Sequence, residues 1–430
     1  MSADLISVLV LVAIFAVGTW RPVNMGAVAL VAAFLLGTAY FGLDTDDIAS
    51  GFPASLFITL VGVTFLFGLA RANGTVDWLV SASVSAVRGR VVLIPWVMFL
   101  LAAIITGIGA ISAATNAILV PIGLAFAQRY RINPMLVGLS ILNGTNAGGF
   151  SPIAVYYTIV EGALDKGGVQ VTPTTIFLAT FLFNLALNLV AFTIFGGWKL
   201  WGRTEQAQPD EDGSTDDAGA GGATTTLVGT RQRIGVDARI TLGLLVALVI
   251  GAVGFDLDVG FLALTAAVLL IVFFPAHAKE AASGIAWNVV LLIGGIVTYV
   301  SMLQEVGVVD SLGNAVAGIN APLLASLLIL LVGGLVSAFA STNAMFGALV
   351  PLTVPFVLVG DLSAFAITAA LCVASSTVDS SPFSTGGALV VANTEKSKQD
   401  KVFRSLMVWG MSMIGIAPIA AWLIFVLPAS

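Results

Sequence analysis

The sequence predicts an all-α polytopic membrane protein built from two repeats of inverted topology. Three observations carry this prediction: 58% of the 430 residues are hydrophobic and only 9% are charged, apolar blocks alternate with short polar joints, and the two halves resemble each other. Apolar groups facing water are costly, so a soluble protein of this size needs more charge on its surface. About 20 apolar residues in a helix span a hydrocarbon core of roughly 30 Å. The blocks are too long and continuous for the strands of a membrane barrel.

The apolar blocks form two sets of six. In the first repeat, residues 1–203, the blocks lie at about 5–20, 24–43, 53–72, 91–128, 133–159 and 173–197. In the second repeat, residues 231–430, they lie at about 237–254, 258–275, 285–304, 321–357, 362–392 and 402–428. The first block lacks the basic start of a cleaved signal peptide, so we expect a retained span. Residues 204–230, between the sets, are rich in Gly, Thr and Asp and predict a flexible linker.

Short motifs recur in the same order in the two halves. Gly74-Thr-Val-Asp77 corresponds to Gly307-Val-Val-Asp310, and Ser151-Pro152 corresponds to Ser381-Pro382 at nearly the same offset along the chain. One match between apolar helices is weak, but five ordered matches at nearly one offset indicate an internal repeat.

The fourth block of each set predicts a re-entrant hairpin, because it is too long for one span and small polar residues interrupt it at 111–117 and 337–344. Each repeat then crosses the membrane five times, and this odd number inverts the second repeat. With the first residue outside, sixteen of the seventeen basic residues lie inside and only Lys166 lies outside. This sorting agrees with the positive-inside rule. Both termini are then outside and the linker is cytoplasmic. Segments 75–90 and 306–320 are interfacial helices or ordinary surface loops.

Four segments place polar residues deep in the membrane. Two are the hairpin tips, and two are breaks at 143–152 and 375–386 inside the fifth span of each repeat. Proline and glycine open these helices, and such breaks persist only where they line a cavity or bind a ligand. Helix amino termini attract anions, whereas freed carbonyls and side-chain oxygens suit a hard cation such as sodium. The alternative is that these side chains only hold membrane helices together through hydrogen bonds.

The candidate ligands are therefore the polar residues of the tips and breaks. The candidate substrate-binding residues are Ser112, Thr115, Asn116, Thr145, Asn146, Ser341, Thr342, Asn343, Ser381, Ser384 and Thr385. The candidate sodium ligands are Asn116, Asn143, Asn146, Gly148, Asn343, Ser376 and Asp379.

Asp379 is the most informative single residue, because a carboxylate within the membrane is expensive and normally faces a cavity with a partner. We expect Asp379 to coordinate the coupling cation or to be protonated during transport. The alternative is a protonated structural aspartate bonded to the opened backbone. Asn143, Asn184 and Asn188 are expected to be packing residues, with Asn143 within reach of the site.

Two other classes of function fit the sequence poorly. An enzyme would need a catalytic constellation, and one histidine (His277) with one cysteine (Cys372) leaves almost nothing from which to build it or a metal cluster. A channel would need a continuous polar pore, whereas the polar positions cluster at mid-depth; flux that never saturates would favour a channel.

The motifs WRPVNMGAVALVAAFLLG, GGFSPIAVYYTIV and SPFSTGGALVVAN resemble those of MatC-type malonate/dicarboxylate carriers. These belong to the ion-transporter superfamily that includes the divalent anion:sodium symporters. In the symporters a Ser-Asn-Thr triplet marks each hairpin tip; here Ser341-Thr342-Asn343 has a permuted order, and Ser112 to Asn116 departs further. The resemblance implies an elevator-type secondary transporter, usually sodium-coupled and homodimeric. It implies a scaffold, formed by the first two spans of each repeat, and a mobile domain.

We therefore expect a symporter of a bacterial inner (plasma) membrane that carries malonate or a similar C3–C4 dicarboxylate with sodium. Two sodium ions near the tips would offset the charge of a dianion in a low-dielectric site. Proton coupling through Asp379 is the alternative mechanism, and gluconate-like hydroxy acids, citrate or an inorganic oxyanion are alternative substrates. We expect no cofactor besides the coupling ion and no nucleic-acid partner.

Overall fold

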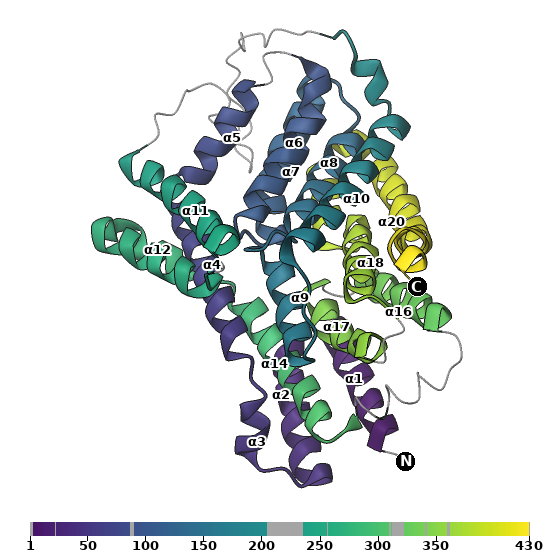
Figure 1. Ribbon diagram of the computed structural model, residues 1–430. Helices are drawn as coiled ribbons and strands as arrows, with labels where there is room; N and C mark the ends of the chain where they lie inside the picture. Colours follow the sequence, from purple (N-terminus) through teal and green to yellow (C-terminus); the bar gives the residue numbers. More distant parts are fainter. Residues whose placement is uncertain are drawn as a thin grey trace.

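The computed structural model describes residues 3–21, 23–86, 90–203, 235–255, 257–308, 311, 322–339, 342–358 and 362–429. Within these ranges every regular element is a helix, as the composition predicts (Figure 1). The 204–230 linker, most of the 306–320 segment and Ser341 of the second predicted tip lie outside the described residues.

The helices of the first half follow the predicted blocks. They are α1 (Ala3–Trp20), α2 (Met25–Leu36, extended by a π-helical turn over Gly37–Phe41), α3 (Thr45–Ser50), α4 (Ala54–Ala72), α5 (Thr75–Ala86), α6 (Ile94–Gly107), α7 (Ser112–Arg129), α8 (Pro134–Gly148), α9 (Val155–Lys166) and α10 (Pro173–Ile194). The segment after α4 thus forms a helix and is not merely a surface loop.

The second half runs through a corresponding series. Its helices are α11 (Val236–Phe255), α12 (Val259–Phe273), α13 (Ala278–Ser283), α14 (Trp287–Glu305), α16 (Pro322–Phe339), α17 (Thr342–Leu358), α18 (Ala364–Thr377), α19 (Thr385–Ala392) and α20 (Gln399–Ala421). A π-helical turn over Trp422–Val426 extends α20.

Five helical segments among the described residues are long and apolar enough to cross a membrane, and six are if the bent α12–α13 pair forms one span. The five are Ala54–Ala72, Pro173–Ile194, Trp287–Glu305, Ala364–Ala392 and Lys396–Ala429. Further apolar helices, including α2 and α6, are shorter than a full span. The protein is therefore a polytopic helical membrane protein, whereas ten crossings stay a prediction.

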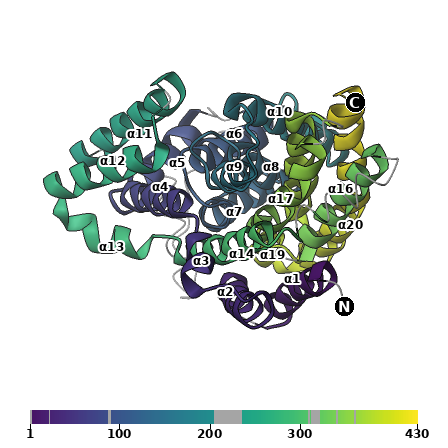
Figure 2. The same ribbon diagram turned by 60° about the horizontal axis from the view of Figure 1, so that its bottom comes forward.

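Helices of the two halves pack on each other in reciprocal pairs. Helix α2 packs on α14 and α12 packs on α4, and Figures 1 and 2 show these two pairs in separate parts of the molecule. In each pair the second span of one repeat packs on the third span of the other repeat. A second reciprocal set has the same form: α9 packs on α17, and α19 packs on α7. This reciprocity is expected of an internal repeat; its inversion across the membrane stays a prediction.

Glycines allow the helices of the α2–α14 and α4–α12 pairs to approach closely. A Cβ on Gly26 would lie 2.0 Å from the Leu291 carbonyl oxygen, and one on Gly295 would lie 1.9 Å from the Gly26 carbonyl oxygen. In the reciprocal pair, a Cβ on Gly62 would lie 2.6 Å from the Gly260 carbonyl oxygen. Small residues let membrane helices pack backbone against backbone. Gly26 corresponds to Gly260, and Gly62 to Gly295, at close to the offset of the predicted repeat.

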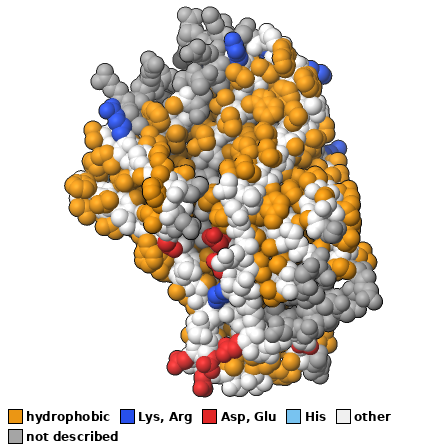
Figure 3. All heavy atoms as spheres, in the orientation of Figure 1, with side chains coloured by type: hydrophobic (Ala, Val, Ile, Leu, Met, Phe, Trp, Pro, Cys, Tyr) orange, Lys and Arg blue, Asp and Glu red, His pale blue; other side chains and the backbone are white. Residues whose placement is uncertain are grey.

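Charged side chains are unevenly distributed over the surface. In Figure 3 the acidic residues gather at the end of the molecule that carries α3, where Asp44, Asp46 and Asp47 are exposed. Lys166, the one basic residue predicted outside, is half-buried and donates a hydrogen bond from Nζ to the Gly51 carbonyl oxygen. Burial lowers the pKa of Lys166.

Candidate functional site

Both hairpin tips and both helix breaks border one cavity of about 420 Å³. This volume lies near the lower end of the range for small-molecule sites, roughly 300–1,000 Å³. The described residues that line it are Met25, Ile111, Ser112, Ala113, Asn116, Leu142, Thr145, Asn146, Tyr156, Val289, Thr342, Asn343, Asp379, Phe383, Ser384, Thr385 and Gly386. The cavity thus joins segments from both halves of the chain.

The first tip is the turn between α6 and α7, which brings the amino terminus of α7 to the cavity. Gly109 makes this turn with φ = +106°, a conformation that L side chains rarely adopt. The Thr106 hydroxyl donates a 3.1 Å hydrogen bond to Thr115 Oγ1, which ties the two arms of the hairpin together. No side chain caps the amino terminus of α7, so the amide groups of its first turn are available to a ligand.

The second tip places Thr342 and Asn343, at the start of α17, against the same cavity. The Thr342 hydroxyl lies 3.0 Å from Ser337 Oγ on α16, and Ser337 Oγ donates a 2.8 Å hydrogen bond to the Ser375 carbonyl oxygen on α18. These contacts attach the second hairpin to the second broken span.

Both predicted breaks interrupt their helices where Pro152 and Pro382 stand. The first separates α8 from α9, and Ser151 in it donates a 2.5 Å hydrogen bond to the Gly107 carbonyl oxygen at the end of α6. The second separates α18 from α19, and Ser384 caps α19 by accepting a 3.1 Å hydrogen bond from the Gly387 amide. Each break therefore contacts a hairpin or starts a helix at the cavity wall.

Two hydrogen bonds join the halves of the chain at the cavity. The Tyr156 hydroxyl on α9 donates to Asp379 Oδ2 over 3.0 Å, and Asn146 Nδ2 on α8 donates to the Ser376 carbonyl oxygen over 2.8 Å. The Tyr156 ring also packs against Phe150 and Phe346, with centroids 5.5 and 5.4 Å away. Asp379 therefore faces the cavity with a fixed hydrogen-bond donor from the other half.

The cavity has an unusual balance of charge. Asp379 is the one carboxylic acid among its seventeen described lining residues, and none of these residues is Lys, Arg or His. The amino termini of α7, α17 and α19 reach the wall at Ser112, Thr342 and Thr385 and supply partial positive charge there. An anion in this cavity would therefore rely on helix termini, and a compensating cation must accompany a dianion if Asp379 is ionised.

Several amide oxygens and hydroxyls at the site are available to a cation. Asn116 Oδ1 and Asn343 Oδ1 are buried and have no hydrogen-bond partner among the described residues. The same holds for Ser376 Oγ and for both polar atoms of the Asn143 side chain. Buried polar groups normally have partners, so these atoms are candidates for contacts with a bound ion, water or substrate.

Nine of the predicted ligands line the cavity: Ser112, Asn116, Thr145, Asn146, Thr342, Asn343, Asp379, Ser384 and Thr385. Five others do not line it. Thr115 bonds to Thr106, Ser381 Oγ donates to the Ala338 carbonyl oxygen over 3.4 Å, and Asn143 and Ser376 are fully buried behind the wall. The fifth, Gly148, packs on α6, where a Cβ would lie 2.1 Å from the Ala103 carbonyl oxygen, and its own carbonyl accepts from the Ser151 amide.

Sequence reasoning missed Tyr156, and it missed the contribution of α2 and α14 to the cavity wall. Met25 of α2 and Val289 of α14 line the cavity, as does Phe383 between Pro382 and Ser384. Tyr156 stands in the first turn of α9 after the break. A carboxylate within the membrane needs a hydrogen-bond donor, and this need of Asp379 could have indicated a nearby tyrosine. No sequence signal marks Met25 or Val289 as wall residues.

The amino-terminal part of the chain matches a known protein family. Residues 1–149 match the family model described as the N-terminus of the dicarboxylate carrier protein MatC. The likeness predicted from the sequence is thereby confirmed for this part of the chain, which contains α1–α8, including the first hairpin. No curated protein matches the sequence.

A solved structure shares the fold over nearly the whole chain. It is the YdaH transporter of Alcanivorax borkumensis, with a TM-score of 0.59 and 14% sequence identity, and the match covers 93% of this chain and 96% of that chain. At this identity the match shows the fold alone. The family matched by residues 1–149 is one of carrier proteins, which agrees with the prediction that the chain is not an enzyme.

Proposed function

We propose that this protein is a secondary active transporter that binds a small dicarboxylate in the cavity between the two hairpin tips. One observation carries the proposal: the tips and breaks of both halves line a single 420 Å³ cavity, whose described wall holds three helix amino termini and no basic side chain. The MatC match over residues 1–149 supports a dicarboxylate as the substrate class.

In this proposal, helix termini bind the two carboxylates. The first-turn amides of α7 and the amides of Thr385 and Gly386 at the start of α19 provide donors at the cavity wall. Partial positive charge at such termini favours anions, and its effect is stronger away from bulk water. Ser112 and Thr385 add hydroxyl donors beside these amides. A short dicarboxylate, such as malonate or a C4 acid, suits a site of this size.

The charges in the cavity support cation coupling. An ionised Asp379 and a dianion would repel each other, so substrate binding is expected to require cations beside them. Asn116 Oδ1, Asn343 Oδ1 and the Asp379 carboxylate offer the hard oxygen ligands that sodium prefers. Protonation of Asp379 would remove the same repulsion, and proton coupling is therefore the alternative mechanism.

The proposal extends to how the site crosses the membrane. The hairpins and broken spans would move as one body past α2 and α14, whose Met25 and Val289 form the facing wall. We further propose a homodimer in a bacterial inner membrane, with the basic ends of the helices in the cytoplasm.

Uptake into proteoliposomes tests this function. Labelled malonate, C4-dicarboxylates, citrate, gluconate and sulfate would be offered in turn, with sodium and pH gradients imposed separately. We expect saturable uptake of a C3–C4 dicarboxylate that rises with an inward sodium gradient. Uptake that follows only the pH gradient would support the proton mechanism. The absence of saturable uptake of every organic anion would reject the proposed function.

A further inference from the structure

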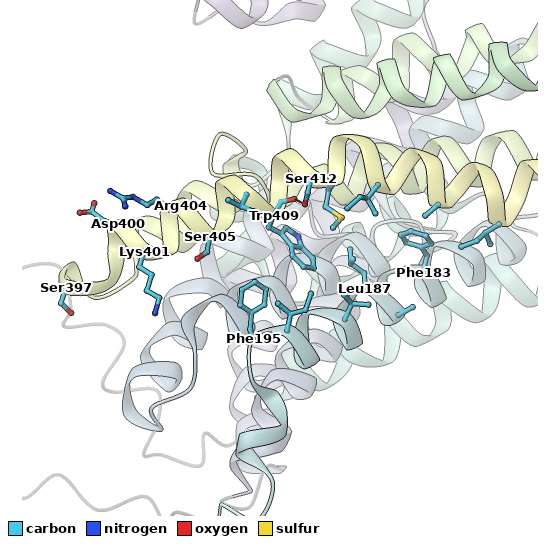
Figure 4. Close-up of a pocket in the computed structure, with 18 residues that line it drawn as sticks. Phe183, Leu187, Phe195, Ser397, Asp400, Lys401, Arg404, Ser405, Trp409 and Ser412 are labelled. Atoms are coloured by element: carbon cyan, nitrogen blue, oxygen red, sulfur yellow. Dashed lines mark hydrogen bonds between the residues drawn. The ribbon is translucent and has the colours of Figure 1, made fainter.

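A long groove runs between α10 and α20 and shares no lining residue with the substrate cavity (Figure 4). Its volume is about 1150 Å³, and apolar side chains such as Leu187, Val190 and Ile416 form most of its walls. Val408 and Ile416 on α20 are 71% and 55% exposed. A flat apolar surface is ordinary on a membrane protein, whereas a groove surrounds an occupant on several sides and can bind it specifically.

Charge is confined to one end of this groove. Asp400, Lys401 and Arg404 line that end, and the other fifteen lining residues carry no charge. Lys401 and Arg404 are exposed and make no ion pair with any residue in the described ranges. By contrast, the nearby Lys398 is paired with Glu395 over 2.8 Å. The end of the groove thus offers two unpaired cations against one acid.

Aromatic side chains place this charged end at the level of a membrane interface. Phe195, at the end of α10, contacts Trp409 of α20 with ring centroids 5.8 Å apart. Beyond Phe195 the chain continues to Trp198 and Trp201, which are 56% and 73% exposed and stack with centroids 6.1 Å apart. Tryptophan gathers at the headgroup level of membranes. Lys401 and Arg404 lie beyond Trp409 toward the same end of the groove, so their charges meet headgroups.

The dimensions agree with one lipid leaflet. Twelve residues of helix separate Arg404 from Ile416, a rise of about 18 Å at 1.5 Å per residue. Half of a hydrocarbon core of roughly 30 Å is close to this length. From these observations we propose that the α10–α20 groove binds an anionic phospholipid, with its phosphate at Lys401 and Arg404 and an acyl chain along Val408 toward Ile416.

Two other occupants fit the groove less well. Residues 204–234 follow α10 and carry acidic residues, but they contain no apolar run long enough to fill the walls. A second copy of the chain would have to bring an acid to Lys401 and Arg404, whereas the same groove on that copy offers two bases and one acid.

Native mass spectrometry of the purified protein tests the proposal with dioleoyl phosphatidylglycerol and dioleoyl phosphatidylcholine, whose acyl chains are identical. We expect preferential retention of phosphatidylglycerol. The double variant Lys401→Gln/Arg404→Gln should lower this retention roughly 25-fold, since each basic residue near an anionic headgroup contributes about fivefold. The control variant Arg239→Gln/Lys279→Gln also removes two exposed charges, in α11 and α13, and should retain the lipid as the parent does.

Two further measurements distinguish lipid binding by the charged end from binding by the apolar walls, and lipid binding from contact with a second copy of the chain. Val190→Trp, which fills the groove without changing charge, should lower retention of both lipids, and it keeps the test valid if the charge variant folds poorly. Equal retention of both lipids by the parent, or unchanged phosphatidylglycerol retention in Lys401→Gln/Arg404→Gln, would overturn the proposal. Cross-linking between copies through Val408→Cys in a lipid bilayer would overturn it as well, because Cys372 is buried and leaves position 408 as the reactive thiol.

Discussion

Tyr156 and Asp379 form a hydrogen bond between side chains of the two halves at the cavity. The tyrosine is held by packing against Phe150 and Phe346, so its hydroxyl is fixed where Asp379 Oδ2 can accept it. A donor in this position stabilises the carboxylate and draws its charge away from an incoming anion. Tyr156 therefore tunes the charge of the site without supplying a positive charge of its own.

Replacing Tyr156 with Phe should weaken substrate binding. Hydrogen bonds to charged groups contribute about 1.5–3 kcal/mol, so we expect the apparent KM for the dicarboxylate to rise roughly tenfold or more with a smaller change in maximal uptake. Tyr157→Phe is the matched control, because the Tyr157 hydroxyl bonds to Glu161 at 3.1 Å on the same helix. An unchanged KM in Tyr156→Phe would remove Tyr156 from the substrate site.

Asp379→Asn should uncouple transport from the cation, because the amide keeps the shape of the side chain but loses its charge and its strongest ligand oxygen. We expect uptake by this variant to lose its dependence on the sodium gradient, or on the pH gradient if the proton mechanism holds. Asp165→Asn, on the exposed surface of α9, should behave as the parent does. Cation-dependent uptake that survives in Asp379→Asn would mean that Asp379 is a structural residue.

At the residue scale the sequence predicted which polar segments lie together, and the structure places them around one cavity. Asn146, Asp379 and Ser384 were predictable because polar residues beside proline and glycine stand out within apolar spans. Their partners were not, since the Tyr156–Asp379 and Asn146–Ser376 contacts join residues 223 and 230 positions apart. Helical periodicity carries no information about which faces of distant helices meet.

Helices α2 and α14 pack so closely that their contact depends on two glycines. Gly26→Ala and Gly295→Ala would each drive a Cβ into backbone at about 2 Å, and backbone cannot move as a flexible side chain can. The reciprocal contact of α4 with α12 uses Gly62 and Gly260 in the same way. Close backbone packing at glycine is therefore common to both helix pairs.

Either substitution, Gly26→Ala or Gly295→Ala, should destabilise the protein by about 1–3 kcal/mol, the usual cost of overpacking. Thermal unfolding in detergent measures the effect as a lower midpoint temperature. Gly243→Ala in α11 is the control, because a Cβ there meets nothing within 4 Å and alanine favours a helix. Equal midpoints for Gly26→Ala and Gly243→Ala would contradict the close packing of α2 on α14.

Helix ends were more predictable than helix pairing. The predicted hairpin and break positions coincide with the α6–α7 turn, the α8–α9 break and the α18–α19 break, because glycine and proline limit where a helix can continue. Pairings such as α9 with α17 were beyond prediction, since apolar faces of similar composition give no basis for choosing between partners.

The proposed movement of the hairpins past α2 and α14 requires that the two walls of the cavity separate. Cysteines at Met25 and Phe383, which line the same cavity, should therefore arrest transport when a short bifunctional thiol reagent joins them. We expect uptake to fall to background in the cross-linked Met25→Cys/Phe383→Cys variant and to return when a cleavable linker is cut. Each single variant treated with the reagent is the control. Full uptake after complete cross-linking would exclude a mobile domain that includes the α18–α19 break.

The absence of basic side chains from the described wall of the cavity also has an electrical consequence. If Asp379 stays ionised throughout the cycle, the empty site carries one negative charge, and a dianion with two sodium ions leaves that charge unchanged. Under this stoichiometry uptake would produce no current and the membrane potential would not drive it. A third cation would make each turnover carry one positive charge inward, and a potential of about 100 mV, negative inside, would then contribute about 2.3 kcal/mol to accumulation. The response of transport to voltage thus depends on how many cations bind with each dianion, because no basic side chain of the described wall balances the charge of the substrate.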